Sequence, residues 1–577
     1  MAEPGLLDEL RALGIERGDL VALAVAPGVG YACATETASA ARAGEAADDV
    51  ARIEAELRPR WVMWSNGTAR VLVEAGVRVA TAWDLAAVHR ILRGGWNAEP
   101  DRIWVDAHRL APDGIPTDRP PDLFSELDTD AGDPEEPVRR DGYLRADWAR
   151  GEWAVSLARV ARWAQLAARL AEHQQRDLAT IDRPAAASLA RSESAAELLC
   201  AELSVDGLPV DLAVAQELIA GAVGPRPRSE ADAQRTRDAR DAAVLRHLPA
   251  GAAFDLRSPG QVKSMLGAVG IEVPDTRAAR LESVRAAHPV VDALLTWRKG
   301  ERIATTYGYA WLDENVHDGR LRGAWTGCDG AAGRMTASAG LHNLPADMRA
   351  AVVAEAGHVF VRADLGQIEP RVLAAVSGDA ALARATQADD LYAPVAAALD
   401  VDRATAKVAV LGAMYGQTTG HGARALRRLD DAYPVAMAYL QEADRAAQAA
   451  QALRTYGGRL IPMGSLAADA ELDPHDARAR VSARGRYGRN AMVQGAAAEL
   501  FKAWAATVRA RGAELDARIV LCLHDELLVH VPATNGADAA QLVTDCLQEA
   551  ASRWAPDGSV RFIAEVSVIA RWSDAKG

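Results

Sequence analysis

Two apolar segments in the C-terminal half of the chain each run into an acidic residue, and no other feature constrains the fold as strongly. Residues 358–363 (HVFVRA) predict a strand that ends at Asp364, after which the chain turns into a helix. Residues 519–531 predict two strands that meet at a tight turn containing Asp525. Taken singly, the first acid also fits a helix N-cap and the second a solvated turn. Together they indicate carboxylates from two strands that hold a pair of divalent cations, because a carboxylate flanked by apolar strands is costly unless it is paired or binds metal.

The segment 400–420 predicts a helix with one distinctive face. Residues four apart lie along one side of an α-helix. Those here are Arg403, Lys407, Leu411 and Tyr415. Two cations, an apolar side chain and an aromatic ring in this order suit a nucleoside triphosphate, with the cations at its phosphates; an ordinary solvated face is the alternative. Gly412 and Gly416 favour nucleotide binding over a solvated face. Glycine inside a helix costs roughly 1 kcal/mol of stability, so two of them suggest that another group approaches the helix closely.

The charge of the chain gives a mixed signal. Lys and Arg number 65 against 79 Asp and Glu, a net charge of −14, which does not indicate a nucleic-acid partner. A nucleic-acid groove needs only a local excess of positive charge. Residues 478–489 contain five arginines and no acid. This run fits either a track for the phosphates of a nucleic acid or an ordinary solvated helix. The chain has only five lysines, so Lys407 is more informative than an arginine at the same place.

Length and cysteine content narrow the class of protein. A chain of 577 residues is long enough for three or four domains at about 150 residues each. The five cysteines are scattered, which argues against a disulfide framework or a cysteine-ligated zinc site and fits a reducing cytosol. No uncharged apolar run approaches about 18 residues, and the start lacks a secretory pattern, so we expect no membrane partner.

The N-terminal part shows an α/β pattern. Strands are predicted at 20–25 and 60–64, with a helix between them at 36–57. Residues 112–142 are rich in Pro, Asp, Glu and Gly and predict an acidic linker or long surface loop. Residues 366–450 are almost wholly helical in pattern.

With these patterns established, the sequence resembles DNA polymerase family A, the bacterial DNA polymerase I type. The order and spacing of the family's motifs agree over roughly residues 190–577. The matching segments are DLGQIEPR (364–371), RATAKVAVLGAMYG (403–416), HDE (524–526), GRMTASAGLHNLP (333–345), YGGRLIP (456–462) and RYGRNAMVQGAAAELFK (486–502).

The resemblance implies a multidomain α+β fold. An α/β exonuclease-like domain would occupy residues 1–145, including the acidic linker, and a polymerase right hand residues 146–577. The parts of the hand would be a helical thumb (about 190–310), an antiparallel palm sheet (about 311–380 and 480–577) and helical fingers (about 381–479).

The resemblance also implies a function: template-directed addition of deoxynucleotides to a primer 3′ end, in DNA repair or replication. Two Mg²⁺ ions, with Mn²⁺ as a substitute, would bind Asp364 and Asp525, with Glu526 nearby. Lys407 would hold the triphosphate and give a proton to the leaving pyrophosphate, which an ammonium can do and a guanidinium hardly can. The partners would be primer–template DNA and dNTPs, bound by a monomer in the bacterial cytoplasm, at the nucleoid.

The remaining site residues fall into two groups by implied ligand. Those implied to bind the dNTP are Arg403, Lys407, Leu411, Tyr415, Glu369 and Gln367. Those implied to contact DNA are Arg334, His342, Asn343, Arg486, Asn490, Gln494 and His524. Within these groups, Glu369 would block a ribose 2′-OH and Tyr415 would stack near the nascent base pair.

The chain departs from the family pattern at several of these positions. Leu411 stands where the family has Phe or Tyr, which weakens stacking on the incoming nucleotide. Leu365-Gly366 replaces Tyr-Ser, Pro370 replaces Leu and His342 replaces Gln. None of these departures removes an expected metal ligand.

The N-terminal domain lacks the acids that a proofreading exonuclease needs. A 3′–5′ exonuclease site uses several carboxylates around two metals. In the best register, Ala34 and Arg70 stand at acidic positions, and only Glu36 and Asp147 remain as candidates. We therefore expect this domain to be inactive.

Two alternatives stay open. One is a catalytically decayed DNA-binding module, which the intact acids and the lysine of the helical face oppose. The other is a bifunctional enzyme with an active 3′–5′ exonuclease, which would need other acids, such as Asp84 or Asp106.

Overall fold

The computed structural model describes residues 5–117, 132–330, 332–416, 423–464 and 474–575. Contacts between residues divide the chain into two compact units. The first comprises Met1–Asp206, Ala324–Thr336 and Gly357–Val568, and the second Gly207–Gly323, Ala337–Ala356 and Ile569–Gly577.

The first unit contains an N-terminal five-stranded sheet in the spatial order β3-β2-β1-β4-β5. Strands β1, β4 and β5 are parallel, whereas β2 and β3 add an antiparallel edge. The strands are β1 (Leu20–Ala26), β2 (Gly30–Ala34), β3 (Ser39–Ala43), β4 (Arg60–Met63) and β5 (Ala82–Asp84). Three helices connect or follow these strands: α2 (Ala47–Glu56), α3 (Asn66–Glu74) and α4 (Leu85–Arg93). The predicted strands and the α/β pattern are thus confirmed.

The helix predicted over 36–57 was wrong in its first half. Residues Ser39–Ala43 form β3 and pair in register with β2, and only Ala47–Glu56 is helical. Alanine favours a helix locally, but pairing with a neighbouring strand outweighs this small propensity. Gly44, at φ +96°, makes the turn between the two elements.

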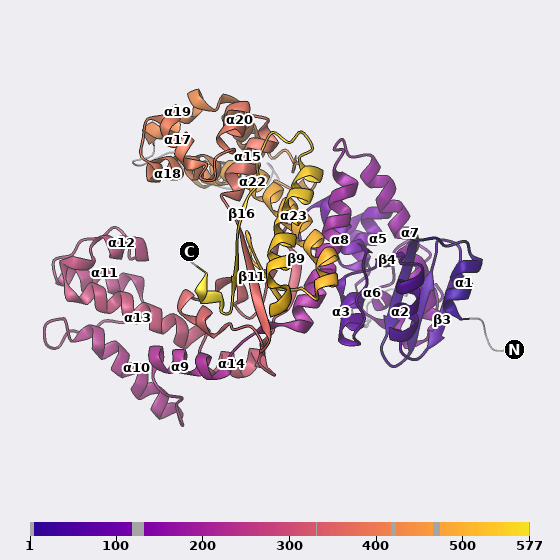
Figure 1. The fold of residues 1–577 in the computed structure, drawn as a ribbon, viewed down its shortest axis with the longest axis horizontal. Coiled ribbons are helices and arrows are strands. Elements are labelled where there is room, and N and C mark those ends of the chain that lie inside the picture. The colour runs from indigo at the N-terminus through magenta and orange to yellow at the C-terminus, as the bar shows by residue number, and fades with distance from the viewer. Residues whose placement is uncertain (1–4, 118–131, 331, 417–422, 465–473, 576–577) are drawn as a thin grey trace. The chain divides into compact units, whose positions relative to one another are not determined.

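A long helix, α7 (Leu157–Ala179), packs against β1, β2 and β3 (Figure 1). Its buried face shares one apolar core with the sheet, including a stack of Trp64 on Trp163 with ring centroids 4.1 Å apart. This core extends the N-terminal layer beyond the predicted boundary at residue 145. Part of the predicted acidic linker, 118–131, lies outside the described residues.

The sheet that carries the predicted acids has four strands in the order β14-β15-β11-β16. They are β11 (His358–Leu365), β14 (Arg518–Cys522), β15 (Glu526–Pro532) and β16 (Ala564–Ile569). Strand β15 pairs antiparallel with both β14 and β11. Two long helices pack on each other beside this sheet, α22 (Pro474–Gly512) and α23 (Gly536–Trp554), and α23 also contacts β11 (Figure 1).

The described part of the chain from α15 to residue 450 is mostly helical, as its pattern predicted. The helices are α15 (Ile368–Ser377), α16 (Ala380–Ala385), α17 (Tyr392–Leu399), α18 (Arg403–Tyr415), α19 (Ala423–Ala432) and α20 (Pro434–Gln448). Pro370 lies in the first turn of α15, where the missing amide proton costs nothing. Residues 417–420 of the predicted functional helix lie outside the described residues.

The second unit is mostly helical around its own apolar core. Its longest helix, α13 (Pro289–Thr306), packs against α9 (Leu212–Val223) and α10 (Glu230–Leu245). Helix α8 (Ala186–Asp206) instead packs in the first unit, against α3 and α22. The second unit starts at Gly207. Within the described ranges, no helix is long and apolar enough to cross a membrane.

Candidate catalytic site

The two predicted metal-binding acids lie at neighbouring strand ends. Asp364, near the end of β11, is in register with Glu526, the first residue of β15. The Leu365 amide donates a hydrogen bond of 2.7 Å to the backbone carbonyl of Asp525. Pairing of the two antiparallel strands thus brings both carboxylates to one edge, although 161 residues separate them in the sequence.

Burial raises the pKa of both acids, and nearby carboxylates add to this effect. The pKa of Asp364 rises to about 6, chiefly because the carboxylate loses water, and next because Asp525 lies close. The pKa of Asp525 is also raised, again mainly by burial. Neighbouring carboxylates that repel each other form a site that a divalent cation would stabilise.

An arginine that the sequence reasoning missed contacts this acidic group. The Nη2 atom of Arg362 lies 2.6 Å from Oδ2 of Asp364, and its Nε lies 3.0 Å from Oε1 of Glu526. Arg362 precedes Asp364 by two residues, so both side chains project from the same face of β11. That spacing was the signal available in the sequence.

Helix α18 presents the predicted cations. Asp402 caps its N-terminus by accepting from the Thr405 amide at 2.9 Å, and Gly416 ends it in the left-handed conformation at φ +68°. A side chain at Gly416 would also collide with Arg486. These two residues therefore fix both ends of the helix.

The two cations on α18 differ in their surroundings. Arg403 pairs with Asp390 at 2.5 Å, a partner that the sequence reasoning did not identify. Lys407 is exposed and forms no ion pair within the described part of the chain. Lys407 is therefore available to an anionic ligand without first breaking an internal contact.

Glu369 brings three predicted site residues together. One of its oxygens accepts from Arg334 at 2.9 Å, and the other accepts from the Tyr415 hydroxyl at 2.8 Å. Burial and the contact with Glu369 raise the pKa of Tyr415 to about 12, so the phenol stays protonated. Arg334 comes from β10 (Arg334–Ala337) and Tyr415 from the end of α18, so one carboxylate joins the sheet region to the helical region.

Gln367 has an internal role in this structure. Its side-chain oxygen accepts from the Leu391 amide at 3.1 Å, and its backbone is left-handed at φ 49°. The fully buried Arg371 donates to the carbonyls of Gly366 and Thr386, among others. These two residues hold the turn after Asp364.

Three predicted DNA contacts follow one another along α22. Arg486, Asn490 and Gln494 recur every four residues and so share a face of the helix. Of the five arginines in 478–489, two serve internal contacts: Arg484 donates to the Ala447 carbonyl, and Arg489 to the Ala413 carbonyl. The exposed positive charge of this run is therefore smaller than the sequence suggested.

Two further predicted DNA contacts lie in the second unit. His342 and Asn343 belong to a short 3₁₀ turn, Leu341–Asn343. The Ala337 amide donates to Nδ1 of His342 at 3.1 Å, and Arg302 donates to the Asn343 carbonyl at 2.6 Å. His524, in the first unit, is exposed on the turn before β15.

A buried ion cluster supports the hairpin that carries Arg334. Glu193 on α8 pairs with Lys502 of α22 and with Arg459, each at 2.5 Å, and all three side chains are at most 2% exposed. Lys502 also donates to the carbonyls of Gly327 and Gly333, at 3.1 and 2.7 Å. Gly333 immediately precedes Arg334, so the cluster fixes the start of its strand. A lysine on an apolar helix of a lysine-poor chain was the signal available in the sequence.

The acids considered for an exonuclease site make ordinary structural contacts. Asp147 pairs with Arg145 at 3.2 Å, and Asp84 caps α4 by accepting from the Ala87 amide at 2.8 Å. Asp106 pairs with Arg102 at 3.0 Å, whereas Glu36 is exposed. Strand β1, the first of the sheet, contains no acid.

The structure also locates the two residues, Ala34 and Arg70, that stand at the acidic positions expected of an exonuclease. Ala34 ends β2, not the first strand, and Arg70 is exposed on α3. Asn66, at the start of α3, donates to Glu197 on α8 at 2.7 Å. The register proposed from sequence therefore mixes positions from different strands and helices.

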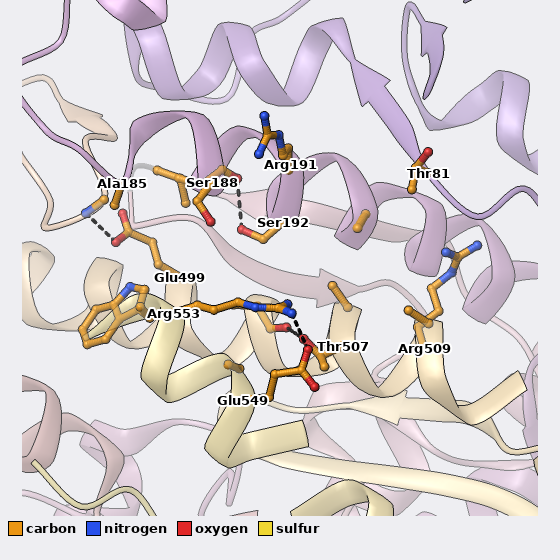
Figure 2. A pocket seen from close by; sticks show the side chains of 18 of the residues that line it. Thr81, Ala185, Ser188, Arg191, Ser192, Glu499, Thr507, Arg509, Glu549 and Arg553 are labelled. Atoms are coloured by element: carbon orange, nitrogen blue, oxygen red, sulfur yellow. Dashed lines mark hydrogen bonds and ion pairs between the residues drawn. The ribbon is translucent and has the colours of Figure 1, made fainter. Parts of the chain in front are cut away.

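A pocket of about 530 Å³ lies elsewhere in the first unit. Figure 2 shows Ser188, Arg191 and Ser192 on α8 on one side, and Glu549 and Arg553 on α23 on the other. Small side chains, mainly alanine, make up much of its wall. Its lining includes none of the residues predicted for catalysis or nucleotide binding.

The fold is that of a DNA polymerase domain. It matches the solved structure of the POL domain of Pol1 from M. smegmatis, in complex with DNA primer-template and dNTP, with a TM-score of 0.69. The match covers 99% of this chain and 98% of that chain, at 22% sequence identity. Residues 229–574 match DNA polymerase family A, and the chain belongs to this family.

Curated relatives agree with this assignment. The chain is 32% identical to thermostable DNA polymerase I of Thermus thermophilus over 332 residues, which are 52% of this chain and 38% of that enzyme. It is 29% identical to the Thermus aquaticus enzyme over 478 residues, 75% of this chain and 53% of the relative. The chain thus spans only about four-tenths to half of the length of these relatives. Family A polymerases use divalent metal ions.

Proposed function

We propose that this protein is a template-directed DNA polymerase that adds deoxynucleotides to a primer 3′ end. The observation that carries the proposal is the pairing of β11 with β15, which brings Asp364 and Asp525 to one edge. The exposed Lys407 on α18 and family membership support it. A decayed DNA-binding module would not be expected to retain these acids together with that lysine.

The donors at the sheet edge fit two Mg²⁺ ions. Asp364 and Asp525 offer the hard oxygen ligands that Mg²⁺ prefers, and their pKa values are raised mainly by burial and further by nearby carboxylates, whose negative charge a cation would offset. Bound there, the ions would activate the primer 3′ oxygen and stabilise charge on the leaving pyrophosphate. Mn²⁺, which takes the same ligands, is a substitute.

The side chains of α18 would bind the nucleotide. Arg403 and Lys407 would hold the triphosphate, and Lys407 would give a proton to the leaving pyrophosphate. Leu411 would contact the sugar and base, although less strongly than an aromatic ring. Tyr415, oriented by Glu369, would stack near the nascent base pair.

Glu369 would exclude ribonucleotides while it orients Arg334 and Tyr415. The DNA would be contacted mainly at the minor-groove edge, where acceptor positions are shared by all base pairs. The residues proposed for this are Arg334, His342, Asn343, Arg486, Asn490, Gln494 and His524. Gln367 would support the nucleotide site through the turn that it holds.

We also propose the roles of the larger parts. Residues up to the end of α7 would form an exonuclease-like domain without nuclease activity, and the second unit would contain the thumb. The four-stranded sheet would be the palm and helices α16–α20 the fingers. The protein would act as a monomer on primer–template DNA, in the cytoplasm at the nucleoid, in repair or replication.

Primer extension tests this function directly. With a 5′-labelled primer–template, Mg²⁺ and dNTPs, the wild type extends the primer, and Asp364→Ala or Asp525→Ala abolishes extension while DNA binding is kept. Asp545→Ala, which removes an acid of α23 outside the site, is the matched control and retains activity. Extension at the wild-type rate by either site variant would refute the assignment of the metal ligands.

The polymerase-silent Asp525→Ala protein also tests the exonuclease proposal. Incubated with a mismatched, labelled primer in Mg²⁺ or Mn²⁺, it leaves the 3′ end intact. Shortening of the primer would show that acids other than Glu36 and Asp147 form a working nuclease site.

A further inference from the structure

Arg362 lies within the cluster of acids at the sheet edge. Its side chain is 8% exposed, and that of Glu526 is 6% exposed, so both groups are largely withdrawn from water. The acids whose charges act on it are Glu526, Asp364 and Glu565, from three adjacent strands. A buried cation among acids is here the permanent counter-charge of the site, because a guanidinium does not lose its proton in a protein.

The contacts of Arg362 with its two neighbours are unequal. Both oxygens of Glu526 are engaged: Oε1 lies 3.0 Å from Nε, and Oε2 accepts from Nη2 at 3.2 Å. Only Oδ2 of Asp364 is engaged, at 2.6 Å. The guanidinium therefore contacts both oxygens of the Glu526 carboxylate, with a hydrogen bond to Oε2 alone, and leaves Oδ1 of Asp364 outside its contact.

We propose that Arg362 withholds Glu526 from the divalent cations and so restricts the metal ligands of this edge to Asp364 and Asp525. This inference rests on the proposed function, because it concerns the same metal site. Glu526 is in register with Asp364 across the strand pair and would otherwise offer a third carboxylate. Arg362 acts through Glu526 and Asp364, and is thus a positioning residue.

The charge of Arg362 should also weaken metal binding. Its guanidinium contacts a carboxylate that would bind the cation, so like charges face each other across Asp364. Arg362 would thus lower the affinity of this edge for cations.

Direct metal binding tests this proposal without polymerase activity. Mn²⁺ binding to the full chain, free of DNA and dNTP, is measured by calorimetry and by the electron paramagnetic resonance signal of free Mn²⁺. Arg362→Gln is expected to bind Mn²⁺ at least tenfold more tightly than the wild type. Glu526→Gln alone should change the affinity less than twofold, because the wild-type metal site does not use Glu526.

The double variant Arg362→Gln/Glu526→Gln separates the proposed ligand from simple charge removal. It should lose most of the tenfold gain, since the released carboxylate is then absent. Arg511→Gln, which breaks an exposed pair with Glu549 at 3.0 Å, is the matched control and should bind as the wild type does. If the double variant keeps the whole gain, Glu526 is not the carboxylate that Arg362 withholds, and the proposal is wrong.

Unchanged or weaker Mn²⁺ binding by a folded Arg362→Gln protein would also overturn the proposal. If that variant fails to fold, Arg362→Lys provides the same test, because it keeps the charge without the fork and should show a smaller gain. No binding by any protein, wild type included, would refute the metal site itself. Binding that Asp364→Asn abolishes, but that Arg362→Gln leaves unchanged, would refute only the role of Arg362.

Discussion

Removal of the Glu193 carboxylate should destabilise the first unit strongly. Glu193→Gln keeps the volume of the side chain but leaves two cations, Lys502 and Arg459, buried at 1% exposure without their counter-charge. Those two cations hold the pKa of Glu193 below its usual range despite its burial. The carboxylate is therefore charged at neutral pH, and its loss leaves a net positive charge in the interior.

The magnitude follows from the burial of all three groups. Breaking a buried ion pair by removing one partner costs about 3–5 kcal/mol, because the remaining charge is neither solvated nor paired. The hydrogen bonds from Lys502 to two backbone carbonyls compensate part of its charge. We therefore expect the free energy of unfolding to fall by about 3–5 kcal/mol, although two cations lose their partner. The urea dependence of a unit this large exceeds that of small proteins, about 1–3 kcal/mol per molar, so the midpoint would fall by less than about 2 M.

Urea unfolding, followed by tryptophan fluorescence, measures this loss. Glu549→Gln is the matched control: Glu549 is 31% exposed and pairs with Arg511 and Arg553 (Figure 2), so its removal should cost less than about 1 kcal/mol. A carboxylate whose pKa is lowered by folding stabilises the folded state at pH values above its pKa in the unfolded state. This stabilisation is lost as the pH falls through the pKa of the folded state. The difference between wild type and Glu193→Gln should thus shrink below about pH 4.5. A loss under about 1 kcal/mol at pH 7 would refute the reasoning.

Four further predictions concern residues of the proposed site. Lys407→Ala should cripple extension and raise the KM for dNTP, whereas Lys407→Arg should restore binding but not full kcat; full activity of the arginine variant in steady-state assays would exclude proton donation. Glu369→Ala should admit ribonucleotides, lowering dNTP/rNTP selectivity by about 10- to 200-fold in single-nucleotide insertion, and unchanged selectivity would place the gate elsewhere. Extension at limiting Mg²⁺ should fall as the pH drops through about 6, because protonated Asp364 cannot bind metal, and more Mg²⁺ should move this fall to lower pH. A pH profile independent of Mg²⁺ would separate Asp364 from metal binding. The same raised pKa means that Asp364 stabilises the metal-free fold only at low pH and loses this effect as the pH rises through about 6, so Asp364→Asn should unfold at a higher temperature than the wild type at pH 8.

Much of the fold could be predicted because its signals are local. The strand before Asp364, the strands around Asp525 and the helix from Arg403 to Tyr415 all have periodicities that depend only on neighbouring residues. Strand β3 was missed for the opposite reason. Its alanine-rich sequence favours a helix, and only its pairing partner β2 makes it a strand.

The candidate site divides in the same way. Residue type and spacing pointed to Asp364, Asp525, Arg403 and Lys407, and the resemblance to the family implied their roles. They gave no indication of Asp390 as the partner of Arg403, which lies thirteen residues away on a different turn.

The sequence by itself determined which residues are candidates for chemistry, because a carboxylate after an apolar strand or a cation every four residues of a helix has few physical uses. Only the tertiary structure decided which of these groups meet. The contacts of Glu369 with Tyr415 and of Arg362 with Glu526 join residues 46 and 164 positions apart. Such contacts depend on strand register and helix packing, which are set by burial of the whole apolar core and leave no periodic trace in the local sequence.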